Sequence, residues 1–250
     1  MKLQSKVVLV TGGGTGIGRA ISMLFAKEGA TVALNYSKSE AEAVDTASEV
    51  AKFGVKSIIV KANVSVDLEV CQMVDRVKQE FGRIDILVNN AGFTRFIDFS
   101  NLRGLTEEIW DEINAVNLKG VFLCCKAVAP FMQEQEGGRI INLASVAGIT
   151  GQGSCIAYCA AKAGVISLTK SLARALGPNI LVNAIAPALT ETRWLDGVDR
   201  APVMRENFQK ASVLKRMGTA EDVSEVALSL AADWSFVTGQ IIVVDGGRML

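Results

Sequence analysis

The sequence predicts an α/β fold, in which a single domain contains one doubly wound, seven-stranded parallel sheet with helices on both faces. Short apolar runs rich in β-branched residues alternate with amphipathic stretches along all 250 residues. Successive positions within the runs are apolar, which is typical of strands buried on both faces and therefore of a parallel sheet. No linker, repeat or low-complexity tract interrupts the alternation, so one domain over 1–250 is expected.

Each element follows from this alternation. The apolar runs predict strands over 7–11, 31–36, 56–61, 84–89, 138–144, 180–185 and 240–245. The stretches between them predict helices over about 16–29, 39–53, 66–82, 106–135, 156–176 and 219–232. Two segments, 93–105 and 187–218, have no clear period. The second contains Pro187, Trp194 and Pro202, and long irregular segments in compact domains are often functional. We expect a substrate lid within about 187–218.

The composition argues against several classes of function. Lysine plus arginine and aspartate plus glutamate each number 26, and the sequence pI is about 6.4, so nothing points to nucleic acid or an anionic membrane surface. No apolar run approaches the roughly 20 residues that a membrane helix needs. The apolar stretch 7–10 runs into glycines, which indicates a buried strand and not a signal peptide. A cytoplasmic protein is expected.

The cysteine and histidine counts restrict the chemistry. Histidine is absent, and the five cysteines are Cys71, Cys124, Cys125, Cys155 and Cys159. No Cys-x-x-Cys pair occurs, so no metal site is predicted. The odd count argues against a disulfide framework and favours reduced thiols. Without histidine, Ser-His-Asp and Cys-His catalysis are excluded, and another side chain must move any proton.

A glycine-rich loop follows the first predicted strand and opens the first predicted helix. It contains Gly12, Thr15, Gly16, Ile17 and Gly18. Glycines permit a tight turn and let backbone N–H groups approach a pyrophosphate, and the helix N-terminus adds positive potential. Turn glycines without a ligand are the alternative. The strand–loop–helix context favours dinucleotide binding and therefore a Rossmann-type domain.

The end of the second predicted strand indicates which dinucleotide binds. An acidic residue at this place would bind the adenosine ribose and repel a 2′-phosphate. The chain has Asn35, Tyr36, Ser37 and Lys38 there, and Arg19 is expected to face the same pocket. NADP(H) is therefore favoured over NAD(H). The alternative is that Lys38 belongs only to a solvated helix turn.

Tyr158 is the strongest candidate for proton transfer. Lys162 follows it by four positions on a predicted helix, so the two side chains share one face. A nearby ammonium stabilises phenolate and would lower the pKa of Tyr158 toward neutrality, where a tyrosine can act as general acid or base. Ser145 ends a predicted strand 13 residues before Tyr158, which places its hydroxyl at the carboxyl edge of the sheet, where ligands bind.

The chain resembles the short-chain dehydrogenase/reductase family over nearly its whole length. The motifs that carry the resemblance are the loop Thr11–Gly18, Asn89-Asn90-Ala91-Gly92, Asn117, Ser145 and Tyr158-x-x-x-Lys162. The resemblance implies that Tyr158 is the proton donor or acceptor and that Lys162 lowers its pKa and binds the nicotinamide ribose. It implies that Ser145 holds the substrate oxygen and that Asn117 supports a water chain to Lys162. Further cofactor contacts are implied for Asn63, Val64, Asn90, Ala91, Gly92, Pro187, Leu189, Thr190 and Thr192.

Three departures from the family pattern stand out. Ala188 follows Pro187 where the family has glycine, and alanine costs about 1 kcal/mol or more if the site needs positive φ. Asn63 stands where the family has an acid beneath the adenine. The segment 93–105 is about three residues longer than is usual in the family and contains Phe93, Phe96 and Phe99.

Two substrate classes fit the resemblance, a free small ketone or secondary alcohol and a 3-oxoacyl group on acyl carrier protein. Members that use a carrier tend to have arginines after the Asn117 helix and after the Tyr158 helix. This chain has Glu134 and Glu136 at the first place and Gly177-Pro178-Asn179 at the second. An acidic carrier would be repelled, so the small substrate is favoured and 3-oxoacyl-[acyl carrier protein] reductase is the alternative. A non-catalytic dinucleotide sensor is disfavoured, since such a protein would lose Tyr158 or Lys162.

Apolar residues exceed what one core-facing stripe requires in the helix predicted near 111–135, and the last ten residues are largely apolar. Excess apolar surface usually marks a subunit contact. The family is commonly tetrameric through such surfaces. A homotetramer is predicted, with a dimer as the alternative.

Overall fold

A parallel sheet organises the protein, whose computed structural model describes residues 1–135 and 137–250. Its seven strands pair in the order β3-β2-β1-β4-β5-β6-β7, and each pairing is parallel. The strands are β1 (Val7–Val10), β2 (Thr31–Tyr36), β3 (Ser57–Lys61), β4 (Ile86–Asn89), β5 (Gly138–Leu143), β6 (Ile180–Pro187) and β7 (Ile241–Val244). The strand order reverses between β1 and β4, which opens a crevice at the carboxyl edge.

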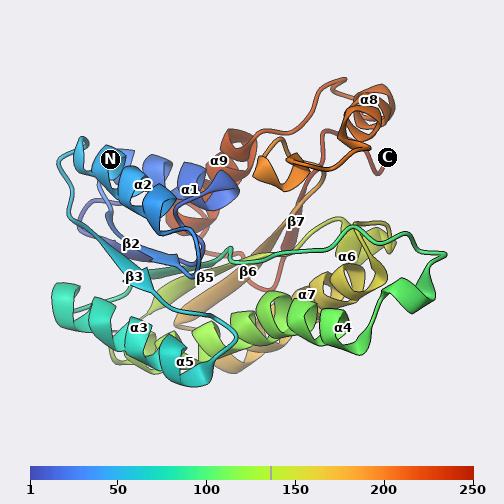
Figure 1. Ribbon diagram of the computed structural model, residues 1–250. Helices are drawn as coiled ribbons and strands as arrows, with labels where there is room; N and C mark the ends of the chain where they lie inside the picture. The colour runs from blue at the N-terminus through green and yellow to red at the C-terminus, as the bar shows by residue number, and fades with distance from the viewer. Residues whose placement is uncertain (136) are drawn as a thin grey trace.

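Helices cover both faces of this sheet (Figure 1). One face carries α1 (Gly16–Lys27), α2 (Glu40–Ala51) and α9 (Ala220–Ala232). The other face carries α3 (Asp67–Phe81), α5 (Gly120–Glu134) and α7 (Ile156–Leu176). The doubly wound α/β fold that the apolar alternation predicts is confirmed.

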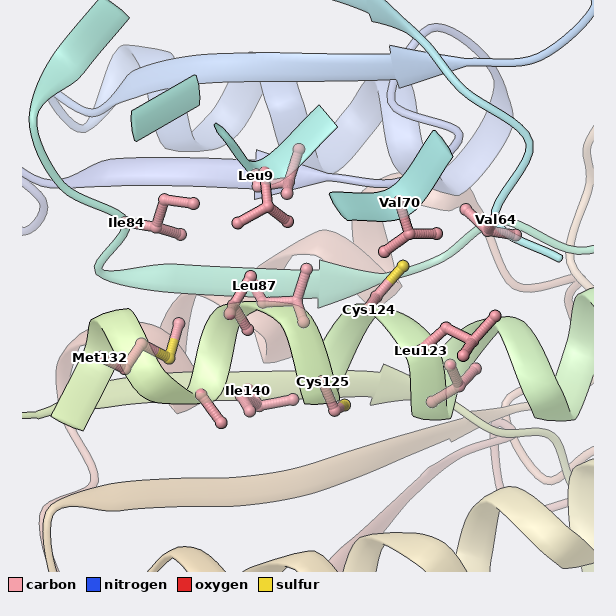
Figure 2. Close-up of a cluster of buried hydrophobic side chains, with 14 of the residues drawn as sticks. Leu9, Val64, Val70, Ile84, Leu87, Leu123, Cys124, Cys125, Met132 and Ile140 are labelled. Atoms are coloured by element: carbon pink, nitrogen blue, oxygen red, sulfur yellow. The ribbon is translucent and has the colours of Figure 1, made fainter. Parts of the chain in front are cut away.

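Two apolar clusters, one on each face, hold the layers together. In Figure 2, Leu9, Leu87 and Ile140 project from three neighbouring strands toward Cys124 and Cys125 of α5. All five side chains are almost fully buried. Burying apolar surface contributes about 25 cal/mol per Å², so these clusters fix the strand ends that form the crevice.

The helix predicted over 106–135 is continuous but is not α-helical throughout. It divides into α4 (Glu107–Asn114), a π-helical turn over Ala115–Lys119, and α5. In the π turn the Gly120 N–H donates to the Ala115 carbonyl, a spacing of five residues. The Asn117 side chain donates to the Ile113 carbonyl at 2.9 Å, so an amide side chain satisfies a backbone acceptor where the helix widens.

Among the described residues this helix alone is long and apolar enough to cross a membrane by length and composition. The expectation from apolar runs did not anticipate this span, Glu107–Glu134. Half of the most apolar part of this helix is buried inside the protein, where α5 packs on the sheet and on α3. The composition is therefore explained by a core helix.

The segment 187–218 contains more regular structure than its sequence suggests. It includes a 3-10 turn η3 (Arg193–Leu195), the helix α8 (Ala201–Ala211) and a bridge between Thr190 and Gly218. Pro202 near the start of α8 is the signal that marks a helix N-terminus. A short helix α6 (Ala147–Thr150) and a 3-10 turn η1 (Leu102–Gly104) also lie in stretches with no predicted helix.

Candidate active site

A cleft of about 1200 Å³ lies at the carboxyl edge of the sheet. Its walls come from the segments that follow β1 to β6, from η3 and α8, and from the last three residues. In Figure 1 this edge faces the gap between α8 with the C-terminus and α6 with α4. The topological switch between β1 and β4 therefore opens into this cleft.

The glycine loop forms one end of the cleft. Gly12 and Gly16 have φ of +62° and +51°, in the left-handed region that favours glycine. A Cβ on Gly18 would lie 2.2 Å from the Gly12 carbonyl oxygen, so the turn closes only with glycine there. No side chain caps the N-terminus of α1, which leaves first-turn N–H groups for an anion. These features fit a dinucleotide pyrophosphate.

Side chains beneath the loop hold it in place. Asn90 Nδ2 donates to the carbonyls of Thr11 and Gly12 at 2.9 and 3.1 Å, and the Asn90 N–H donates to Thr11 Oγ1 at 2.9 Å. The Asn35 carboxamide accepts from the Gly12 N–H and donates to the Ala62 carbonyl. Asn35 is 1% exposed, so its side chain supports the loop and does not extend toward a ligand.

The charges along the cleft favour an anionic ligand. Among the described lining residues the charged ones are Lys38, Arg95, Glu112, Lys162, Arg193 and Arg248. Five of these six are cationic, in a chain whose charges balance. No carboxylate occurs in the segment 35–39 at the end of β2, where an NAD-type acid would stand.

Asn63 lies at the adenosine end but already has hydrogen-bond partners. Its Oδ1 accepts from the N–H and the hydroxyl of Ser65 at 3.1 and 2.8 Å. Its backbone N–H donates to Glu69 at 2.7 Å. The amide therefore stabilises the turn after β3, and its expected contact with an adenine amino group competes with Ser65.

Ser145, Tyr158 and Lys162 come together at the middle of the cleft. Ser145 follows β5 and is held by the Ala147 N–H, which donates to its Oγ at 3.1 Å. Tyr158 and Lys162 extend from the first two turns of α7, and the Lys162 ammonium lies 5.7 Å from the centre of the Tyr158 ring. Lys162 Nζ donates to the Leu143 carbonyl at 2.6 Å. The phenol of Tyr158, the hydroxyl of Ser145 and the ammonium of Lys162 thus lie in one site.

Burial controls the protonation of this group. Burial raises the pKa of Tyr158 well above 10, and hydrogen bonding to Ser145 lowers it only partly. This direction is opposite to the lowering expected from Lys162, and burial of the phenol is its main cause. Burial lowers the pKa of Lys162 to about 8. At neutral pH Tyr158 is a phenol, the form that donates a proton.

Asn117 lies behind the cleft and does not line it. It is fully buried in the π turn, and its Nδ2 donates to the Phe93 and Ile113 carbonyls at 2.8 and 2.9 Å. Its Oδ1 has no protein partner, and a Cβ on Gly92 would approach that oxygen to 2.7 Å. A buried acceptor without a partner is a natural place for an ordered water.

A buried chain of polar side chains, which no local sequence pattern indicates, links two strands of the sheet to α7. Asn89 Nδ2 donates to Asn142 Oδ1 at 2.9 Å, and Asn142 Nδ2 donates to Thr169 Oγ1 at 3.0 Å. The chain links β4, β5 and α7, so it fixes the strand that leads to Ser145 relative to the helix that carries Tyr158. Buried hydrogen bonds of this kind help to rigidify a core, although Asn89 Oδ1 itself is buried without a partner.

The structure brings most of the remaining predicted residues to the cleft. Those that line it are Gly12, Thr15, Gly16, Ile17, Tyr36, Ser37, Val64, Ala91, Gly92, Pro187, Leu189, Thr190 and Thr192. Gly18 lies behind the loop, and Arg19 is on the exposed side of α1. Ala188 lines the cleft without positive φ, which among described non-glycine residues occurs at Ser5 and Lys215. The strain considered for Ala188 does not arise.

Trp194 lies beside Tyr158 in the cleft wall. The two rings meet edge to face, with centroids 5.7 Å apart. Phe93 and Phe96 line the same end of the cleft. No local sequence pattern predicts the contact of Trp194 with Tyr158 or that of Arg193 with Glu42, because each contact joins segments far apart in the chain.

Comparison with known proteins identifies reductases that are similar over almost the whole chain. The family model described as enoyl-(acyl carrier protein) reductase matches residues 12–248. A 3-oxoacyl-[acyl-carrier-protein] reductase of Thermotoga maritima is 43% identical over 253 residues, with all of both chains covered. The enzyme of the same name from Staphylococcus epidermidis is 40% identical and covers 98% of this chain and 100% of its own length.

A solved structure gives independent support. Levodione reductase has a TM-score of 0.92 and 34% identity, with 98% of each chain covered. Members of the family transfer hydride with NAD(P)(H). The glycine loop, the Ser145–Tyr158–Lys162 group and these similarities have one common explanation, which is that the chain belongs to the short-chain dehydrogenase/reductase family of oxidoreductases.

Proposed function

We propose that the protein is an NADP(H)-dependent reductase that converts the ketone of a 3-oxoacyl thioester to the secondary alcohol. The observation that carries the proposal is the convergence of Ser145 and Tyr158 beside Lys162 at the carboxyl edge of the sheet. The reduced nicotinamide supplies the hydride when bound. The protein supplies the proton and holds the substrate oxygen.

Each catalytic residue has a role in this proposal. The Ser145 hydroxyl donates a hydrogen bond to the ketone oxygen and orients it. The Tyr158 hydroxyl transfers its proton to that oxygen as the carbonyl carbon accepts hydride. The raised pKa of Tyr158 keeps the phenol protonated, and Lys162 stabilises the phenolate left behind through its charge. Two hydroxyls at one point suit a reacting oxygen better than the carbon–carbon double bond that the family description names.

The proposed choice of NADP(H) rests on charge. The β2 end offers Ser37 and Lys38 and no carboxylate, and the cleft lining is predominantly cationic. An adenosine 2′-phosphate is therefore accommodated, whereas the NAD-type acid that would repel it is missing.

The 3-oxoacyl substrate class is supported by the names of the relatives and by the mouth of the cleft. The relatives from Thermotoga maritima and Staphylococcus epidermidis are both named for a 3-oxoacyl group on a carrier protein. Arg95 and Arg248 line the cleft, and cations there suit the phosphate of a pantetheine-linked substrate. Phe93, Phe96 and Trp194 offer apolar contact to the acyl chain.

A free small ketone is the second candidate, and one observation favours it. Glu134 at the end of α5 has a side chain that is 69% exposed. Members of the family that use a carrier protein tend to have an arginine at this place. Lys78 lies 3.6 Å from this carboxylate and offsets part of its charge. Glu136 lies outside the described residues. The neighbour of known structure is named for a small diketone substrate, levodione.

Assembly and location complete the proposal. Trp110 and Phe122 are 40% and 44% exposed on the α4–α5 helix, and Val243 of β7 is 40% exposed. Exposed apolar side chains on these elements fit contacts between copies of the chain. We infer a cytoplasmic homotetramer, with a dimer as the alternative, and a substrate lid within 187–218.

Rates with the same acyl group on different thiol carriers test the proposed function. We would compare kcat/KM for 3-oxobutanoyl groups on acyl carrier protein, on coenzyme A and on N-acetylcysteamine, and for a simple ketone, each with NADPH. A tenfold or greater preference for either phosphate-bearing thioester supports the 3-oxoacyl proposal. Equal or better rates with the simple ketone overturn it in favour of the second candidate.

A charge reversal separates carrier protein from coenzyme A. Glu134→Arg should raise kcat/KM for the carrier-bound substrate at low salt, because the acidic carrier is no longer repelled. Coenzyme A should be unaffected. Glu225→Arg on α9, on the opposite face of the sheet, is the matched control. An equal gain in the control shows that the effect is one of net charge, not of a docking site.

A further inference from the structure

The turn η3 reaches across the mouth of the cleft to the helix after β2. Arg193 in this turn contacts Glu42 of α2, with Nη1 3.1 Å from Oε1, and its Nη2 donates to Ser39 Oγ at 2.9 Å. The two paired residues are 151 positions apart in the chain. The ion pair therefore joins the lid segment to the adenosine end of the cleft.

Neighbouring contacts define where the Arg193 guanidinium lies. Thr192, the preceding residue, is the nearest side chain to Gly16, where a Cβ would be 3.6 Å away. Gly14 packs against the first turn of α2, where a Cβ would lie 2.8 Å from Ala43 Cα. Ser39 directly follows Ser37 and Lys38 at the end of β2. Arg193 thus lies over the glycine loop and beside the place of the ribose 2′ substituent.

We propose that Arg193 is a specificity-determining residue that binds the adenosine 2′-phosphate from the lid side of the cleft. This inference rests on the proposed use of NADP(H). A guanidinium binds phosphate through two parallel N–H donors, which the point charge of Lys38 does not provide. Lys38 approaches from β2 and Arg193 from η3, so the phosphate would be held from two sides.

Glu42 is the competitor for Arg193 in this arrangement. Both side chains of the pair are about half exposed, at 47% and 49%, and exposed ion pairs are weak and exchange readily. A phosphate with close to two negative charges is the stronger partner for a guanidinium. Arg193 therefore exchanges Glu42 for the phosphate when NADP(H) binds.

The same turn carries Trp194, which contacts Tyr158. Adjacent residues of η3 thus reach the adenosine end and the catalytic end of the cleft. Anchoring Arg193 on the cofactor also holds Trp194 over the substrate position.

Calorimetric titration of the full chain tests the inference without turnover. We would measure Kd for NADPH, NADH and 2′,5′-ADP in the unmodified protein and in Arg193→Gln. The variant should bind NADPH and 2′,5′-ADP about tenfold more weakly and NADH within about twofold, because one charge-assisted bidentate contact to phosphate is lost. Glu42→Gln should strengthen NADPH binding about threefold, because the competing carboxylate is removed.

Arg205→Gln is the matched control. Arg205 pairs with Glu191 in the same lid segment, with Nε 2.9 Å from Oε2, and does not line the cleft. Its cofactor affinities should not change. Equal weakening of NADPH and NADH by Arg193→Gln assigns the guanidinium to the pyrophosphate and overturns the inference, as does an unchanged NADPH affinity. A preference of the unmodified protein for NADH would overturn the proposed use of NADP(H), and the inference with it. That result comes from the unmodified protein alone and is therefore distinct from a result with the Arg193 variant.

Discussion

The floor of the cleft and the lid that covers it are built from different interactions. The floor is buried: Lys162 is 4% exposed, and the hydrogen-bonded side chains of Asn89, Asn142 and Thr169 are almost fully buried. The segment 187–218 has only a small apolar cluster around Leu195, Phe208 and Met217, and its ion pairs Arg193–Glu42 and Arg205–Glu191 are exposed. Breaking a buried polar network is costly, whereas exposed pairs contribute little. We therefore expect the floor to be preorganised and the ion pairs of 187–218, the proposed lid, to break at low cost.

The largest effect is expected at the floor, from Tyr158→Phe. The change removes the transferable proton and keeps the ring against Trp194. Turnover should fall by about 10²-fold or more, as expected for loss of a general acid, while the Kd for NADPH stays within about threefold because the phosphate contacts are elsewhere. Steady-state kinetics and titration check both halves. Near-normal turnover would show that Tyr158 is not the proton donor.

The next largest effect should come from Gly18→Ala. The added Cβ would lie 2.2 Å from the Gly12 carbonyl oxygen, so the loop must open. Dinucleotide affinity should fall by about 10²-fold, since the loop N–H groups lose their alignment. Gly218→Ala in the lid is the matched change, because its Cβ would meet nothing closer than 3.7 Å. Similar losses in both variants would contradict the contrast between floor and lid.

Lys162→Met should change how stability depends on pH. The pKa of Lys162 is lowered to about 8 in the folded protein from its ordinary 10.5. Between these values the unfolded chain binds the extra proton, so the unfolding free energy of the unmodified protein rises with pH, by up to about 1.4 kcal/mol per unit. The variant lacks this rise. Denaturant unfolding from pH 7 to 10 should therefore give curves that diverge, and parallel curves would refute the assignment.

The smallest effect is expected in the lid, from Arg205→Gln. Its pair with Glu191 is exposed, and such pairs add little to folding. The thermal midpoint should stay within about 2 °C. Scanning calorimetry measures it. If Arg205→Gln lowered the thermal midpoint as much as a substitution of Asn89, Asn142 or Thr169 does, the segment 187–218 would be as firmly held as the floor.

Local spacing explains which parts of the site could be predicted from the sequence. The glycine loop and the Tyr158–Lys162 pair each lie within a few residues, so strand and helix periods alone place their groups. The Arg193–Glu42 pair joins residues 151 positions apart, and no local pattern contains it. The pKa of Tyr158 was predicted in the wrong direction, because burial depends on the whole fold and not on the neighbouring lysine.

Secondary structure shows the same limit. Buried strands gave clear apolar runs, whereas the amphipathic pattern of α8 was too short to separate from a loop. The π turn was missed because one extra residue barely disturbs the helical period over a long helix. Asn117 is a poor helix former in the middle of a long predicted helix, which is a trace of that irregularity in the sequence.

The π turn also makes the active site depend on chain length. Within Ala115–Lys119 one residue more is wound into the turn than an α-helix would hold. Deleting one residue there would restore a regular helix and leave the orientation of α4 relative to α5 nearly unchanged, because the wide turn holds its extra residue over about the same rotation. The widened turn itself would be lost, and with it the place from which the Asn117 side chain donates to the Phe93 and Ile113 carbonyls. A single-residue gap aligned to this stretch would therefore indicate that the wide turn is absent while the two flanking helices keep their directions.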